Sequence, residues 1–247
     1  MEHDITNAFD IPAMDLNNLG RTGDETSGSV DDSLTPDEEE ALIRKPRSRG
    51  IKTHSRQFYR RYTSERKLEE TLDWEFTPGS AYHVISGGDI DSLTFLKLIL
   101  RQQPLNYLSL STWCMALQDI EELERYIKLG RIKRLDSYVG EIFKGSYGNE
   151  YRQLCDLHKR YGGRAAIFRN HAKVFCGFGN RFDFVIESSA NINTNPRAEN
   201  TVITIDKGLA YFYKDYFDGI ISFERNFDDW TPSRIDQPYS LPTCQYD

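Results

Sequence analysis

The sequence has no run of eighteen apolar residues, which excludes a hydrophobic helix of the length that crosses a membrane. Its first eighteen residues are acidic and carry no basic stretch ahead of an apolar one, unlike a secretory signal. We therefore expect a cytoplasmic protein that has no membrane partner.

Cysteine is also scarce, and the four cysteines form no C-x-x-C pair: Cys114, Cys155, Cys176 and Cys244. This spacing favours reduced, mostly buried thiols and argues against a zinc site. His83 and His158 have no Cys or His neighbour at metal-ligand spacing. We expect His83 in the core, His158 on the surface, and neither a metal ion nor another cofactor.

Basic residues are nearly absent from the first part of the chain, although the net charge is only -7 over 247 residues. Residues 1–43 form an acidic, polar segment that we expect to be a disordered tail. Residues 44–78 are basic, and Arg56, Arg60 and Arg61 alternate there with aromatic residues. This pattern fits either an arm that contacts nucleic acid or a solvated linker that leads into a short helix at 64–72.

Alternating strand and helix patterns begin near residue 79 and predict an α/β domain with a sheet flanked by helices. The expected strands are 81–86, 106–112, 132–139, 164–168 and 201–206. One expected helix begins at Asp91 or Ser92. Three others cover 116–129, 149–160 and 209–222. The last helix carries an aromatic stripe that is typical of a core face and also of a subunit contact. We expect the domain to cover 79–226 and an irregular tail to cover 227–247.

The stretch with most potential chemistry starts at His171 and Lys173, which lie one residue apart where a strand pattern begins. Side chains two residues apart in a strand share a face, so we expect these two to project together. A second apolar run at 182–188 predicts a hairpin, with its turn at 177–180, whose Gly and Asn residues tolerate positive φ. The hairpin would bring Ser189 and Asn191, after the second run, towards His171 and Lys173.

This set of groups suits a phosphodiester. An imidazole attacks phosphorus or protonates the leaving oxygen, while a lysine and neutral donors stabilise charge on the phosphoryl oxygens. A plainer interpretation is a surface His-Lys pair followed by residues with good turn composition.

His171-Ala172-Lys173, the segment Ser188 to Asn191, and Glu199 together resemble the phospholipase D superfamily. The resemblance implies a phospholipase D-like mixed sheet and His171 as nucleophile or general acid. It implies Lys173 and Asn191, with Ser189, as phosphate ligands, and Glu199 as a residue that orients a histidine. Asn193 and Arg197 in the same polar cluster are further candidates for substrate binding.

The chain departs from the family pattern at two positions and contains a single His-x-Lys. Phe178 and Gly179 stand where the family has an Asp, and Ser188 stands where it has a Gly. One motif per chain implies a homodimer that builds its site from two copies. We expect a metal-independent phosphodiesterase that acts on nucleic acid; the alternatives are a catalytically inactive nucleic-acid-binding protein and, less favoured, a structural scaffold.

Overall fold

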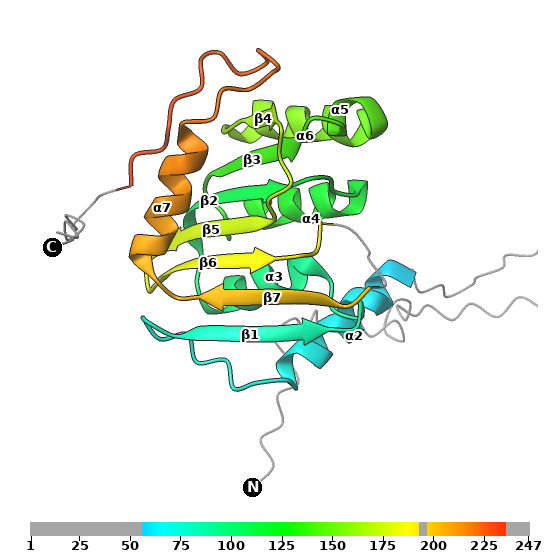
Figure 1. The fold of residues 1–247 in the computed structure, drawn as a ribbon, viewed down its shortest axis with the longest axis vertical. Helices are drawn as coiled ribbons and strands as arrows, with labels where there is room; N and C mark the ends of the chain where they lie inside the picture. Colours follow the sequence, from blue (N-terminus) through cyan, green and yellow to red (C-terminus); the bar gives the residue numbers. More distant parts are fainter. Residues whose placement is uncertain (1–55, 193–196, 236–247) are drawn as a thin grey trace, which may run out of the picture. The chain divides into compact units, whose positions relative to one another are not determined.

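The computed structural model describes residues 56–192 and 197–235, with the backbone alone over 56–62 (Figure 1). Within these ranges the chain forms a seven-stranded sheet in the order β1-β7-β6-β5-β2-β3-β4. The strands are β1 (Ala81–Ser86), β2 (Leu105–Thr112), β3 (Leu135–Gly140), β4 (Ala165–Phe168), β5 (Val174–Gly179), β6 (Asp183–Ser188) and β7 (Glu199–Thr204). β2, β3 and β4 are parallel, and the other neighbouring pairs are antiparallel. The predicted α/β class with a mixed sheet is therefore confirmed.

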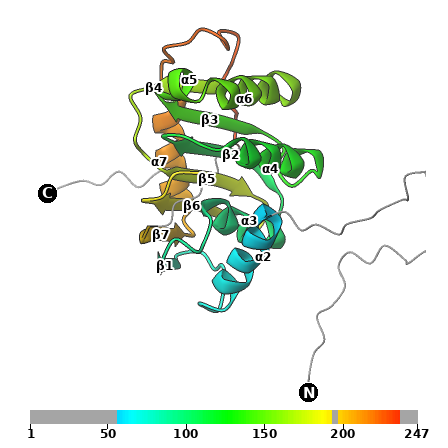
Figure 2. The same cartoon turned by 90° about the vertical axis from the view of Figure 1, so that its right-hand side faces the viewer.

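Helices lie on both faces of the sheet (Figure 2). They are α2 (Arg56–Glu69), α3 (Ser92–Gln102), α4 (Leu117–Lys128), α5 (Phe143–Ser146), α6 (Gly148–Tyr161) and α7 (Lys207–Asp218). α7 packs on β5 and β6 at one face, while α3, α4 and α6 cover the other, and α2 packs on α3. Each face therefore has its own apolar cluster between the sheet and its helices.

Most predicted elements are present because their local signals are strong. Asp91 caps α3 by accepting a hydrogen bond from Leu93 N, and Pro104 follows the last turn of that helix. α4 and α6 bury one apolar face each, as their periodicity predicts. The short helix α5 carries too few residues for a periodic pattern and was not predicted.

The helix expected at 64–72 is longer at its start and ends earlier, at Glu69. Ser64 is fully buried and does not begin the helix. Its hydroxyl pairs with Thr94 Oγ1 at 2.8 Å and accepts the Asp91 N–H at 2.8 Å. Glu65 forms ion pairs with Lys97 and Arg101 of α3. Contacts with α3, which the sequence of α2 does not reveal, thus hold this helix on the domain.

β5 and β6 form the predicted hairpin, but the turn lies later than expected. Gly177, Phe178 and Gly179 belong to β5, and neither glycine has a positive φ. At Gly177 a Cβ would lie 2.3 Å from Phe184 Cε1, so this glycine is needed for close packing within the sheet. The turn expected at 177–180 therefore begins later, because the strand continues through Gly179.

Both histidine placements were also wrong. His158 is buried on α6, with Nε2 2.9 Å from Ser137 Oγ, and burial lowers its pKa to about 4. His83 lies on β1, whose outer face carries exposed residues, and its side chain is exposed. The expectation of buried thiols is confirmed for the three described cysteines, Cys114, Cys155 and Cys176.

The segment after Phe227 has no helix or strand as far as Ile235; the rest of the tail expected at 227–247 lies outside the described residues. It nevertheless packs on the domain, because Trp230 Nε1 donates to the buried Asp136 at 3.0 Å and its ring lies 3.6 Å from the Arg164 guanidinium. Among the helices of the described ranges, none has both the length and the apolar composition to span a bilayer.

Candidate functional site

The polar residues of interest lie at one edge of the sheet, on the right in Figure 1. This edge is formed by the ends of the strands and not by an outermost strand. The carboxyl ends of β1, β2, β3, β4 and β6 lie at this edge, as do the starts of β5 and β7. Loops that leave strand ends carry side chains beyond the sheet without breaking its hydrogen bonds. This edge therefore offers a supported position for a site.

His171 and Lys173 lie directly before β5, in extended chain rather than within the strand. They contact each other as predicted: Lys173 Nζ lies 2.9 Å from His171 Nδ1 and donates to the His171 carbonyl at 2.7 Å. His171 is exposed and Lys173 is half-buried. The Trp113 ring, at the end of β2, lies 5.7 Å from the imidazole. An accessible imidazole thus has a lysine ammonium beside it.

Asn170 holds the backbone of this pair in place. Its Nδ2 donates to Ser111 Oγ, Thr112 O and Tyr138 O, and its Oδ1 accepts the Ala172 N–H at 2.9 Å. These bonds tie the loop to the ends of β2 and β3. The side chain is 5% exposed, so the bonds are shielded from water. Sequence reasoning missed Asn170 and Trp113; their positions directly after strands were the only available signal.

The end of β6 brings the second polar group to the same edge. Ser188 N donates to Lys173 O at 3.0 Å, so the hairpin register places these two residues opposite each other. Ser189 Oγ donates to the Glu199 carboxylate and accepts the Asn200 N–H at 3.1 Å. The only proton of the Ser189 hydroxyl is therefore directed to Glu199.

Asn191 follows β6 and lies against the end of β2 and the start of α3. Its carbonyl accepts a hydrogen bond from Ser92 Oγ at 2.9 Å, and the next residue, Ile192, bridges to Met115. Asn191 Oδ1 is buried without a hydrogen-bond partner among the described residues. This amide has hydrogen-bonding capacity that the described residues do not satisfy.

The electrostatics of the site centre on Lys173. Burial lowers its pKa, and the neighbouring Cys114 and Glu199 act in the opposite direction. Burial raises the pKa of the Cys114 thiol, and Cys114 in turn raises the pKa of Tyr147. Glu199 therefore favours the charged form of Lys173, which lies near the buried thiol of Cys114.

The remaining predicted residues have separate positions. Arg197 is exposed on the loop before β7. Arg56, Arg60 and Arg61 lie on α2, but their side chains are outside the described part of the structure. Asn193 is outside the described residues altogether. The structure thus brings together His171, Lys173, Ser189 and Glu199.

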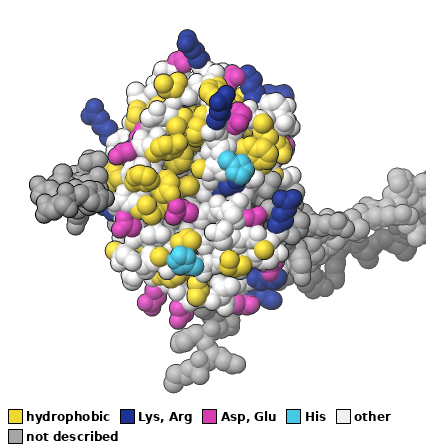
Figure 3. Space-filling model, viewed as in Figure 1, with side chains coloured by type: hydrophobic (Ala, Val, Ile, Leu, Met, Phe, Trp, Pro, Cys, Tyr) yellow, Lys and Arg dark blue, Asp and Glu magenta, His cyan; other side chains and the backbone are white. Residues whose placement is uncertain are grey.

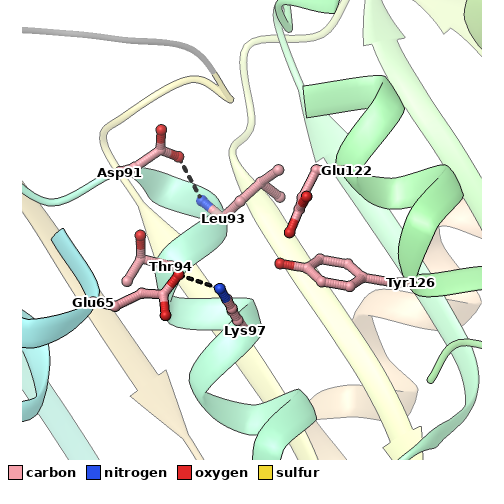
Figure 4. Close-up of a pocket in the computed structure, with 7 residues that line it drawn as sticks. All are labelled: Glu65, Asp91, Leu93, Thr94, Lys97, Glu122 and Tyr126. Carbon is pink, nitrogen blue, oxygen red and sulfur yellow. Dashed lines mark hydrogen bonds and ion pairs between the residues drawn. The ribbon is translucent and has the colours of Figure 1, made fainter. Parts of the chain in front are cut away.

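The hollow between α2, α3 and α4 is a different feature (Figure 4). Its volume is about 10 Å³, which is about the room that one water molecule needs. Glu65 and Lys97 form an ion pair at its wall, and Glu122 and Tyr126 face them from α4. Its size excludes a substrate, so it is a gap in helix packing.

No group of three or more His, Cys, Asp or Glu side chains with metal-binding placement exists within residues 56–192 and 197–235. Phe178, which stands where the phospholipase D superfamily has an Asp, lies at the far end of β5 from Lys173. Its ring packs 4.9 Å from Tyr211 in the cluster under α7, and Asp183 pairs with it across the hairpin. The departure from the family pattern thus affects packing at the opposite edge of the sheet.

No protein-family model matches the sequence, and no curated protein matches it. The fold is similar to several solved structures. One is polyphosphate kinase from Porphyromonas gingivalis, at 16% identity and a TM-score of 0.46, with 59% of this chain and 27% of the kinase covered. Another is Nuc from Salmonella typhimurium, described as a phospholipase D family member, at 18% identity and a TM-score of 0.42, with 56% and 91% covered.

TrmBL2, described as an archaeal chromatin protein with a novel mode of DNA binding, is similar at 12% identity and a TM-score of 0.41, with 65% of this chain and 60% of TrmBL2 covered. Nuc is thus described as a member of the family that the motif resembles.

Proposed function

We propose that this protein is a phosphodiesterase that cleaves nucleic acid without a metal ion, through a phosphohistidine on His171. The contact between His171 and Lys173 carries the proposal, because it places a nucleophile and a cation together at an accessible edge. Lys173 Nζ and Asn191 Nδ2 donate to phosphoryl oxygens. Glu199 supports the charge on Lys173.

In the first step an imidazole nitrogen of His171 attacks phosphorus. A P–N bond forms, the P–O bond breaks, and the leaving oxygen takes a proton from the partner's His171. In the second step water attacks the phosphohistidine and gives its proton to the same histidine of the partner subunit, so the P–N bond breaks and both imidazoles are restored.

The single His-x-Lys motif in each chain is the reason for invoking a second copy. Exposed apolar side chains on and after α7 fit a contact between copies: Phe212, Tyr216, Ile221 and Phe223. Figure 3 shows hydrophobic side chains gathered over this region. Ile221 is 87% exposed, and a gathering of exposed apolar side chains of this kind marks a surface suited to contact with another protein.

The favoured substrate is nucleic acid. The basic residues of α2, including Arg56, Arg60 and Arg61, supply cations of the kind that contact phosphates. The aromatic residues among them are suited to stacking on bases.

The test is incubation of labelled single- and double-stranded DNA and RNA with the protein in EDTA. We expect cleavage by the wild type and none by His171→Ala. The control is His83→Ala, which removes an exposed histidine of β1 and should still cleave. Normal cleavage by His171→Ala, or loss of wild-type cleavage in EDTA, contradicts the proposal.

The second candidate is a nucleic-acid-binding protein without catalysis, which the Phe178 departure favours. The position of Phe178 weakens that argument, because about five residues of extended chain, or roughly 16 Å, separate it from Lys173. Equal binding without cleavage by wild type and His171→Ala identifies this second function.

A further inference from the structure

A second concave site lies at the edge of the sheet opposite His171. It is a cavity of about 370 Å³ between the start of β2, the end of β5, the first turn of α7 and residues 233–235. In Figure 1 this is the left-hand edge, where β7 leads into α7. The volume is within the range of small-molecule sites in proteins.

Three cationic side chains line this cavity: Arg134, Lys207 and Arg234. Asp183 is its one carboxylate, in a chain whose net charge is -7. Arg234 is exposed and Lys207 is half-buried, so both remain accessible to a ligand. The excess of positive charge favours an anion.

The Arg134 side chain is fixed in position by contacts within the protein. One terminal nitrogen donates to Thr231 O at 2.8 Å and lies 3.9 Å from the Asp136 carboxylate, which anchors the guanidinium. Its Nε is buried with no hydrogen-bond partner among the described residues. An anchored guanidinium loses little entropy when its exposed part binds a phosphate or carboxylate.

Aromatic rings lie behind the surface of the cavity: Tyr107 and Phe178 are each 2% exposed and Tyr211 is 8% exposed. Phe178 lies 4.9 Å from Tyr211 and 6.1 Å from Tyr107. Burial raises the pKa of Tyr107, so its ring stays uncharged near neutral pH. These buried rings support the cavity, and its cations and carboxylate set the chemistry of the ligand.

Asp183 restricts the choice of ligand further. It accepts the Gly179 N–H at 3.2 Å, and Lys207 lies near enough to offset part of its charge. Its carboxylate accepts hydrogen bonds, which suits a ligand with hydroxyl or amino groups as well as a phosphate.

We infer that this cavity binds a small organic phosphate of mononucleotide type, with the phosphate on Arg134, Lys207 and Arg234 and the hydroxyl or amino groups of the ligand on Asp183. The inference does not depend on the proposed cleavage reaction. Lys173 directly precedes β5 and Gly179 ends it, so the two residues lie roughly 20 Å apart at the rise of an extended strand.

The test is calorimetric titration of the full chain with adenosine monophosphate, adenosine and inorganic phosphate. We expect the monophosphate to bind more tightly than either of the other two. Arg234→Met and Lys207→Met each remove one charged contact and should weaken binding about tenfold or more. Arg225→Met, an exposed cation of the same C-terminal segment outside the cavity, should leave affinity unchanged.

His171→Ala separates the two sites. Unchanged affinity for the monophosphate in this variant supports binding in the cavity lined by Arg134, Lys207 and Arg234, whether or not the variant still cleaves nucleic acid. Affinity that is lost in His171→Ala but kept in Arg234→Met and Lys207→Met overturns the inference, and so does equal binding of adenosine and its monophosphate. Absence of binding at millimolar monophosphate, with the variants' circular dichroism equal to that of the wild type, overturns it as well.

Discussion

Asn170 is buried directly before His171 and uses both ends of its amide group to hold the chain. The amide nitrogen reaches acceptors at the ends of β2 and β3, and the amide oxygen accepts the Ala172 N–H. Because the same bonds set the path of the backbone at His171, Asn170 is a positioning residue and does not itself touch the substrate in our proposal.

We predict that Asn170→Ala lowers the free energy of unfolding by about 2 kcal/mol, because it leaves buried polar groups without partners. Urea denaturation measures this loss. Asn180→Ala is the matched control: Asn180 is exposed and accepts one bond from Asn106 Nδ2, so the expected change is under about 0.5 kcal/mol. Equal losses in the two variants contradict the assigned role.

His158 is the residue whose burial most clearly links pH to stability. Its folded pKa of about 4 lies below the unfolded value, so the unfolded chain takes up a proton first as the pH falls. The stabilising contribution is therefore complete above about pH 6.5 and disappears progressively down to about pH 4.

We predict that this histidine removes about 3 kcal/mol of stability between about pH 6.5 and 4. His158→Gln cannot titrate, so its unfolding free energy should lose this component of the pH dependence, whatever its absolute value. The check is urea denaturation of both proteins across that pH window. Parallel pH profiles for the two proteins disprove the assignment.

Among the elements, the β5–β6 hairpin does most to build the candidate site. Its register places Lys173 opposite Ser188. That register depends on close packing at Gly177, where a side chain would collide with the buried ring of Phe184. The hairpin therefore connects interior packing with the alignment of the polar residues at the edge.

We predict that Gly177→Ala destabilises the protein by about 1 to 3 kcal/mol, as overpacking of a core does. Gly145→Ala is the matched control, since a Cβ on Gly145 in α5 meets nothing within 4 Å. Alanine there should be neutral or slightly stabilising, because it reduces the freedom of the unfolded chain. Thermal unfolding of the two variants distinguishes them, and a neutral Gly177→Ala removes the proposed constraint on register.

For the whole molecule, the proposed mechanism requires a His171 from each of two copies. Mixed dimers with one His171→Ala chain then lack either the nucleophile or the acid. If chains exchange freely, activity should fall as the square of the wild-type fraction when His171→Ala protein is added at constant total protein.

The control for this mixing experiment is Arg152→Met, an exposed change on α6 that should keep activity constant at every ratio. Equilibrium sedimentation shows whether dimers form at the assay concentration. A linear fall with the His171→Ala protein, in a dimeric sample, contradicts a shared active site and leaves each copy with an independent one.

The sequence by itself determined the α/β class, the positions of most strands and helices, and the His171–Lys173 pair. These depend on local signals: apolar periodicity, the Asp91 cap, and the spacing of two side chains near a strand. The contact between Lys173 and His171 follows from that spacing even though the pair precedes β5.

Only the tertiary structure decided what depends on distant partners. Burial of His158 requires Ser137 of β3, the anchoring of α2 requires Thr94 of α3, and the role of Asn170 requires the ends of two other strands. The far cavity likewise joins residues from five separate segments. No local pattern encodes these neighbours, because long-range packing alone brings together residues that lie far apart in the chain.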